Sequence, residues 1–225
     1  ASDQPLIRQG AESATIVAKV NEGLAAGDHA RELELSCEII PGKTNRATLN
    51  GVPLGRAREL LGVLQTVVFA PEDLALVKGD PSERRRFLDD TITQLQPGFA
   101  STRADLDRVL RQRNALLKSG YSQRDVDLLR TLDAWDEQLA AVGSQVLAAR
   151  LQLLRQLKQP VADAYTRVSS DRGPLEISFE TSLGIDETAN ADLCRAAIES
   201  ALASHRRQEL DRGVTLVGPQ RDELA

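Results

Sequence analysis

The stretch LLRTLDAWDEQLAAVGSQVLAARLQL, residues 128–153, decides the fold, because its apolar residues recur at alternating steps of four and three. These positions are Leu128, Leu132, Trp135, Leu139, Val142, Val146, Ala149 and Leu153. This spacing places them in the a and d positions of about three and a half heptads. The pattern predicts a long helix over residues 122–168 with a coiled-coil seam, in which Trp135 is a core residue and not a platform for stacking bases.

A partner for this helix precedes it in the sequence. Residues 99–118 form a second helical pattern, which ends before a Ser-Gly pair. Two antiparallel helices would make an arm over residues 98–170, and at ~1.5 Å per residue the stretch 123–159 alone would extend on the order of 50 Å. Pro160 should kink the long helix or break it. The alternative is that this helix forms one wall of an ordinary helical bundle.

Before the arm, the hydrophobic pattern changes to the alternation that is typical of half-buried β-strands. Residues 14–20, 31–40 and 46–54 predict three strands of a small antiparallel sheet. The third of these stretches contains Asn50-Gly51 as a tight hairpin turn, because both residues tolerate positive φ.

Further elements are expected between this sheet and the arm. Residues 55–64 predict a short helix, and QTVVFA (65–70) predicts a buried strand. A helix should then begin with Asp80 as the N-cap, Pro81 in the first turn and Glu83 as in a capping box.

After the arm, the period of the sequence returns to two. LEISFE (175–180) predicts a strand, residues 188–211 predict a helix, and GVTLVGPQRDEL predicts the start of a last strand. We therefore expect an α+β fold in which residues 1–97 form a head lobe, residues 98–170 form the arm, and residues 171–225 return to the head. The two flanks of the arm should then pack together.

Composition narrows the classes of function. The net charge is −5, so any contact with nucleic acid must come from a local basic patch. Cys37 and Cys194 are expected to be reduced thiols of a cytosolic protein, and two histidines without paired cysteines predict no structural metal site. No apolar run approaches the ~18 residues of a membrane span. The chain has no methionine and both of its ends look cut, which predicts a fragment of a longer protein.

The tetrapeptide PGKT, residues 41–44, ends like a phosphate-binding loop. Such a loop needs a glycine five positions before its Gly-Lys pair and a helix after it. Here Cys37 occupies the upstream position within a predicted strand, and a hairpin pattern follows. We predict a turn between two strands. The competing hypothesis, a self-contained P-loop NTPase, requires ATP binding that is lost on Lys43→Ala.

Three segments carry a resemblance to a known family: FAPEDLALVKGDPSERRRFLDD (69–90), LRQRNALLKSG (110–120) and TLVGPQRDEL (215–224). Their order and spacing, with the arm between the second and the third, resemble the RecF family of bacterial DNA replication and repair proteins over essentially the whole chain. The last motif usually reads GPHRDDL in that family, so Gln220 and Glu223 are departures from it.

The resemblance implies part of an ABC-type ATPase head related to the SMC proteins, namely its β-rich lobe, with an inserted antiparallel coiled-coil lever arm. It implies a homodimer that forms on binding ATP and Mg²⁺ and that binds double-stranded and gapped DNA or single-strand–double-strand junctions. It also implies cooperation with RecO and RecR in loading RecA during DNA recombination and repair, roles in DNA replication and the SOS response, and a cytoplasmic location at the nucleoid.

The same resemblance implies where the ATPase chemistry lies. The family's Walker A loop would precede Ala1, and its signature motif and Walker B carboxylates would follow Ala225. The parent protein would be a slow DNA-dependent ATPase, whereas this chain alone should neither hydrolyse ATP nor bind it tightly, and no catalytic or metal-binding residue is assigned within it. The alternative is a coiled-coil interaction module of another SMC-like protein, without a DNA role of its own.

Arg84, Arg85 and Arg86 form a basic cluster early in the capped helix. They are candidates for contacts with DNA phosphates or with nucleotide across the dimer, because arginine binds phosphate in bidentate geometry. Consecutive positions point in different directions around a helix, so at most two of them can serve one surface. The alternative is a solvated helix face neutralised by nearby carboxylates.

Arg108, Arg111 and Lys118 lie close to one stripe of the first arm helix, while Arg113 points elsewhere. The stripe could follow a phosphate backbone. It could equally be the exposed surface of the arm, where nearby aspartates weaken the positive field.

Glu72 and Asp73 follow the predicted buried strand, and Arg221 and Asp222 lie in the last motif. All four are candidates for positions near the nucleotide. The alternatives are an N-cap and turn for the first pair and a salt-bridged structural turn for the second.

Overall fold

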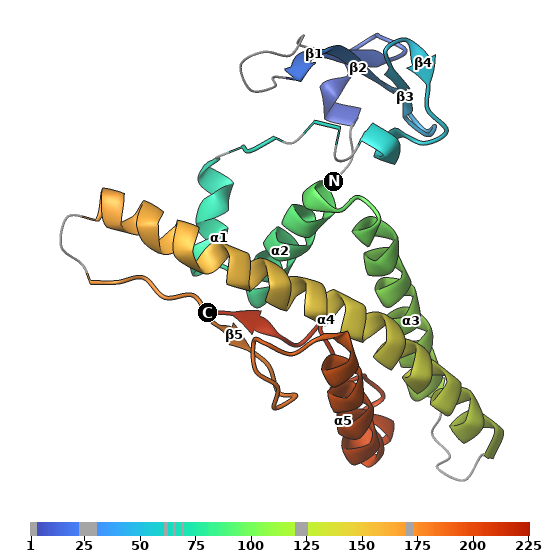
Figure 1. Ribbon diagram of the computed structural model, residues 1–225. Helices are drawn as coiled ribbons and strands as arrows, with labels where there is room; N and C mark the ends of the chain where they lie inside the picture. Colours follow the sequence, from blue (N-terminus) through green and yellow to red (C-terminus); the bar gives the residue numbers. More distant parts are fainter. Residues whose placement is uncertain are drawn as a thin grey trace. The chain divides into compact units, whose positions relative to one another are not determined.

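The computed structural model of the chain describes residues 4–22, 31–60, 63–64, 66–68, 70–119, 126–169 and 173–225. The chain divides into two compact units, Ala1–Val68 and Phe69–Ala225, each considered by itself below (Figure 1). The domain boundaries expected at residues 97 and 170 stay a prediction. Among the helices in the described part of the chain, none is long and apolar enough to cross a membrane.

The first unit is a four-stranded antiparallel sheet in the order β1-β2-β3-β4. The strands are β1 (Ala14–Glu22), β2 (Arg31–Ile39), β3 (Arg46–Leu49) and β4 (Val52–Pro53). Two short 3₁₀ helices, η1 (Gln4–Leu6) and η2 (Ala57–Leu60), precede and follow the sheet in the sequence. Leu33, Leu35 and Ile39 are buried on one face of β2, as the alternating sequence predicted.

Both turns expected in this sheet are confirmed. In PGKT, the backbone N–H of Lys43 donates to the carbonyl of Ile40 at 3.2 Å, and strand β3 follows instead of a helix. Asn50 and Gly51 join β3 to β4 with φ angles of 51° and 77°. The side-chain Oδ1 of Asn50 accepts from the N–H of Glu34 at 2.8 Å, which ties the hairpin to β2.

Two other expectations for the region before the arm are corrected. Among the described residues of the stretch 55–64, the predicted helix is replaced by the short 3₁₀ turn η2. The strand predicted over residues 65–70 is wrong, because the described residues of this stretch belong to no strand and the side chain of Val67 is fully exposed. An apolar run supplies side chains for a core but no hydrogen-bonding neighbour, and a strand needs both.

The second unit is mostly helical. Its elements are η3 (Pro71–Leu74), α1 (Ala75–Lys78), α2 (Pro81–Leu95), α3 (Phe99–Ser119), α4 (Val126–Val168), β5 (Phe179–Glu180), α5 (Ala191–Arg212) and β6 (Glu223–Leu224). The predicted start of α2 is confirmed, since the side chain of Asp80 accepts from the N–H of Ser82 at 2.8 Å and Pro81 is the first helical residue.

The predicted pairing of the two long helices is confirmed, because α3 and α4 pack against each other (Figure 1). The sequence did not predict that α5 packs on α4 as a third helix. Because α4 packs against both α3 and α5, it buries apolar residues outside the predicted coiled-coil seam as well as within it. Of the predicted seam residues, Leu132, Leu139, Val146 and Leu153 are buried, and so are Ala140, Leu147, Leu151 and Leu154 outside it. The side chain of Leu128 lies outside the described residues. Helix α4 continues through Pro160 and ends at Val168.

Strands β5 and β6 pair antiparallel and bring the stretch after the arm together with the end of the chain. The ladder extends by two backbone hydrogen bonds between Ser178 and Ala225, of 2.8 and 2.9 Å. The strand expected over residues 175–180 is therefore shorter than predicted. Helix α2 packs against β6, so the last helix before the helical pair contacts the end of the chain. For residues 1–68, which form the other unit, packing against residues 171–225 stays a prediction.

Candidate functional site

Residues 213–225, here called the closing segment, run from the end of α5 to β6 with little regular structure. The segment is nevertheless well buried: Thr215, Val217 and Asp222 each expose 2% or less of their surface. A buried irregular backbone must find hydrogen-bond partners for its polar groups. Helical side chains supply several of these partners, namely Arg85 of α2, Asn114 of α3, Arg150 of α4 and Glu209 of α5.

Helix α3 holds the beginning of the closing segment. Arg113 is fully buried, and its Nη1 donates to the hydroxyl of Thr215 at 2.8 Å. The next residue, Asn114, accepts from both the N–H and the hydroxyl of Thr215, each at 2.8 Å. Asp136 of α4 and Glu209 of α5 neutralise the Arg113 guanidinium at 2.7 and 2.5 Å. One arginine thus joins three helices to the closing segment.

Helix α4 holds the middle of the segment through a second buried arginine. Arg150 donates to the carbonyl of Pro219 at 2.6 Å, and its other two nitrogens bind the carboxylate of Asp89 on α2 at 2.8 and 2.9 Å. Arg103 of α3 adds a further bond to Asp89 at 2.6 Å. This fork geometry fixes the orientation of the guanidinium as well as its position.

The closing segment approaches the backbone of α4 closely at Gly143. A Cβ at Gly143 would lie 3.3 Å from a ring carbon of Pro219 and 3.3 Å from the terminal methyl of Ile198 on α5. Glycine costs a helix interior about 1 kcal/mol relative to alanine. Its presence here is explained by the close approach of both neighbours.

Helix α2 holds the end of the segment. Arg84 forms an ion pair with Glu223, and Arg85 donates to the backbone carbonyl of Asp222 at 2.8 Å. The Arg84 side chain is only 16% exposed, and burial lowers the pKa of Arg85. Both arginines are therefore tied to the interior of the unit.

Asp222 is the one carboxylate of the closing segment that is buried with neither oxygen in a well-formed hydrogen bond among the described residues. Burial raises its pKa to about 6, although Thr181, Arg150 and Arg85 lie near enough to favour the charged form. Burial dominates, because the Thr181 hydroxyl does not reach hydrogen-bond geometry with the Asp222 carboxylate. Burial and the Asp222 charge together raise the pKa of Cys194 to about 11, so this buried residue is a protonated thiol at neutral pH.

Comparison with known proteins gives the family of the chain. The chain is 48% identical over 234 residues to the DNA replication and repair protein RecF of Kineococcus radiotolerans, and this match covers 99% of the chain. The RecF of Streptomyces avermitilis is also 48% identical, over 229 residues and 99% of the chain. The chain belongs to the RecF family. No family model matches it.

The match covers only part of each RecF relative. The chain spans 58% of the Kineococcus protein and 59% of the Streptomyces protein. Two solved RecF structures of the RecFOR pathway superimpose on the whole chain, over 58% of their own length. One is described as RecF-ATPrS (TM-score 0.84, 24% identity) and the other as RecF-ATP (TM-score 0.83, 26% identity). The fold is therefore the α+β fold of RecF, as the resemblance implied.

The three segments that carried the resemblance to RecF meet at the closing segment. Arg85 and Asp89 come from the first of them, Arg113 comes from the second, and the closing segment contains the third. Arg150 lies in none of them. Sequence reasoning missed Arg113 and Arg150 as organising residues. The available signal was a lone arginine within otherwise apolar helix positions, which is unfavourable unless it is paired.

The basic candidates from the RecF resemblance differ in their surroundings. Arg86 exposes 72% of its side chain and pairs with Asp90 at 3.5 Å, in contrast to its two neighbours. Arg108, Arg111 and Lys118 are all exposed on α3, and Arg108 pairs with Asp105 at 2.9 Å. Their roles stay predictions.

Two of the four candidates for positions near the nucleotide, Asp73 and Arg221, have internal partners. The Asp73 carboxylate accepts from the N–H of Ala70 at 2.7 Å, which is a local turn. Arg221 donates to the carbonyl of Thr215 at 2.9 Å and closes a loop within the closing segment. The side chain of Glu72 lies outside the described residues. Among the described residues, no group of three or more His, Cys, Asp or Glu side chains is arranged to hold a metal ion.

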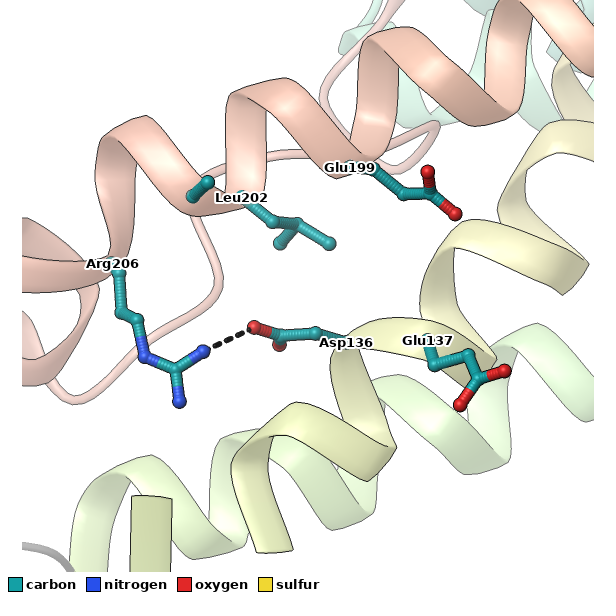
Figure 2. A pocket seen from close by; sticks show the side chains of 6 residues that line it. Asp136, Glu137, Glu199, Leu202 and Arg206 are labelled. Atoms are coloured by element: carbon teal, nitrogen blue, oxygen red, sulfur yellow. Dashed lines mark hydrogen bonds and ion pairs between the residues drawn. The ribbon is translucent and has the colours of Figure 1, made fainter. Parts of the chain in front are cut away.

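A groove of about 240 Å³ lies between α4 and α5 (Figure 2). Leu202 and Ala203 line it together with Glu137, Glu199 and the Asp136–Arg206 ion pair of 2.9 Å. Burial raises the pKa of Asp136, although Arg113 and Arg206 oppose this. The groove is shallow and largely apolar, and its acidic groups are partly neutralised by arginines, since Glu199 also pairs with Arg195.

Proposed function

We propose that this chain is the arm-bearing part of a RecF-type DNA repair and replication ATPase. In this proposal the longer protein dimerises on binding ATP and Mg²⁺, binds double-stranded and gapped DNA, and helps RecO and RecR to load RecA. It acts in the cytoplasm at the nucleoid. The chain supplies part of the head and the lever arm, with surfaces for DNA and for the dimer.

One observation carries the proposal: identity of 48% to curated RecF proteins along 99% of the chain. A match of this extent includes the head-side segments and the helical arm together. An unrelated coiled-coil module would not be expected to match RecF along its whole length. A P-loop built on PGKT is disfavoured as well, because these residues form a turn between two strands.

For the DNA surface, the proposal rests on the outer face of α3. Arg108, Arg111 and Lys118 are exposed there, while Arg113 and Asn114 face inward to the closing segment. A stripe of cations along a helix can bind a phosphate backbone, because such binding depends mainly on electrostatic attraction and requires no contacts with the bases. Arg86 is the member of the arginine cluster that the proposal keeps for DNA, because Arg84 and Arg85 are tied internally.

The test compares DNA binding by the longer protein that contains this sequence with binding by its Arg108→Ala/Arg111→Ala variant. Each lost phosphate contact should reduce the slope of log K against log salt by about 0.9, so the double variant should lose about 1.8 and bind more weakly at low salt. The matched control is Arg195→Ala, since Arg195 is also an exposed helical arginine in an ion pair. An unchanged salt slope would refute the α3 surface.

For the nucleotide, we propose that the ATPase residues lie in the remaining length of the RecF relatives, and that the 225-residue chain alone neither binds ATP tightly nor hydrolyses it. The parts of an ATPase site act together, so a chain with only some of them has no activity. Roles near the nucleotide for Glu72, Asp73, Arg221 and Asp222 stay predictions. Measurable ATP turnover by the purified chain that is lost in Lys43→Ala would contradict the proposal.

A further inference from the structure

We propose that the closing segment is a mechanical connector that carries a displacement of α3 and α4 to the β5–β6 ladder. The proposal rests on where the segment is held and by what kind of group. Its attachments lie at its beginning, its middle and its end, and each comes from a different helix.

The attachment to α3 is rigid. Arg113 is fully buried, and its planar guanidinium is held by Asp136 and Glu209 as well as by Thr215. Asn114 grips the same threonine through two further bonds. Thr215 should therefore follow α3 when that helix moves, because a rotamer change at Arg113 would leave buried charges unpaired and would also break its bond to Thr215.

The segment beyond this attachment is short and internally braced. Arg221 donates to the carbonyl of Thr215 at 2.9 Å, and the N–H of Arg221 donates to the carbonyl of Gly218 at 3.0 Å. Between these points Arg150 holds the Pro219 carbonyl, and the ring packs near Gly143 of α4. A braced loop moves as one body and transmits displacement instead of absorbing it.

The far end of the segment delivers this movement to two places. Arg85 and Arg84 of α2 bind the backbone of Asp222 and the side chain of Glu223. Ala225 then exchanges two hydrogen bonds with Ser178 in the ladder. A shift of α3 that moves Thr215 should thus lengthen or shorten the hydrogen bonds at the far end of the closing segment.

The connector also suggests how the arm could report DNA contact, a step that rests on the proposed function. Helix α3 carries the exposed cations Arg108 and Arg111 on one face and Arg113 with Asn114 on another. A load on the outer cations would act on the same rigid helix that holds Thr215. The connector itself requires no DNA and is tested without it.

The experiment measures amide hydrogen exchange by NMR in the 225-residue chain, without nucleotide or DNA. In Arg113→Lys, which keeps the charge but loses the planar fork, the amides of Ser178 and Ala225 should exchange roughly tenfold faster than in the parent chain, the change expected from about one weakened charge-assisted hydrogen bond. Asn114→Ala, a milder change, should act in the same direction. Arg108→Lys, on the exposed face of α3, is the matched control and should leave both amides unchanged.

The alternative is that Arg113 stabilises only its surroundings. Faster exchange confined to residues near Thr215, with Ser178 and Ala225 as in the parent chain, would overturn the connector. If Arg113→Lys fails to fold, the Asn114→Ala result decides in the same way. Since neither ATP nor DNA is present, this outcome is independent of the salt-slope experiment on the proposed function.

Discussion

Replacing Asp222 by asparagine should make the second unit more stable at neutral pH. Asp222 is 1% exposed, and burial raises its pKa from 3.8 to about 6. The folded state therefore binds the proton more tightly than the unfolded state, and ionisation costs folding stability. The cost is absent below the unfolded pKa, grows between pH 3.8 and about 6, and is complete above that. The difference between these two pKa values corresponds to about 3 kcal/mol.

An asparagine side chain has nearly the same shape as aspartate and no charge, so Asp222→Asn should raise the free energy of unfolding by up to about 3 kcal/mol at about pH 7.5. The gain should shrink as the pH falls through about 6 and should be small near pH 4. Urea unfolding at several pH values, followed by the fluorescence of Trp135, measures the difference between the two proteins. Asp163→Asn, at an exposed carboxylate of α4, is the control, and its effect on stability at neutral pH should be much smaller than that of Asp222→Asn. A pH-independent difference for Asp222→Asn, or a loss of stability at neutral pH, would refute the reasoning.

Two further predictions concern the packing of α4. Arg150→Met leaves the buried Asp89 with Arg103 as its remaining ion-pair partner and should lower the free energy of unfolding in urea by about 3–5 kcal/mol. Adding Asp89→Leu should recover part of that loss. If the effects of the two substitutions on the free energy of unfolding simply add, the two residues do not act as a pair. Leu147→Ala leaves a cavity at a fully buried position of α4 and should lower the free energy of unfolding by about 2–5 kcal/mol. The control Leu193→Ala, at an exposed position, should lower it by less than about 1 kcal/mol. Equal losses would show that α5 does not cover α4 as described.

Periodic elements of this fold could be predicted from the sequence. The sheet strands, the cap at Asp80 and the two long helices each follow from local rules, namely alternation, N-capping and heptad spacing. The strand predicted over residues 65–70 failed because periodicity cannot say whether a neighbouring strand exists. The packing of α5 on α4 was missed for a related reason, because α4 contacts α5 through residues outside the predicted a and d positions, such as Asp136 and Gly143.

The candidate site was less predictable than the fold. Arg84 and Arg85 belong to the same basic run as Arg86, but their contacts with the distant residues Glu223 and Asp222 give them a different environment. Likewise, nothing local to Arg113 announces Thr215, which lies 102 positions further on. Arginine on a helix has the same sequence appearance whether it faces water or a buried carboxylate. Its partners are set by tertiary packing.

The close approach at Gly143 has a consequence for how this protein can vary through evolution. Gly143, Ile198 and Pro219 share one small volume although they belong to three separate stretches of the chain. Homologous proteins that carry a larger residue at the first position should therefore carry a compensating smaller one at the second or third. Correlated substitution among these three sites, seen across many genomes, would be the record of that shared space.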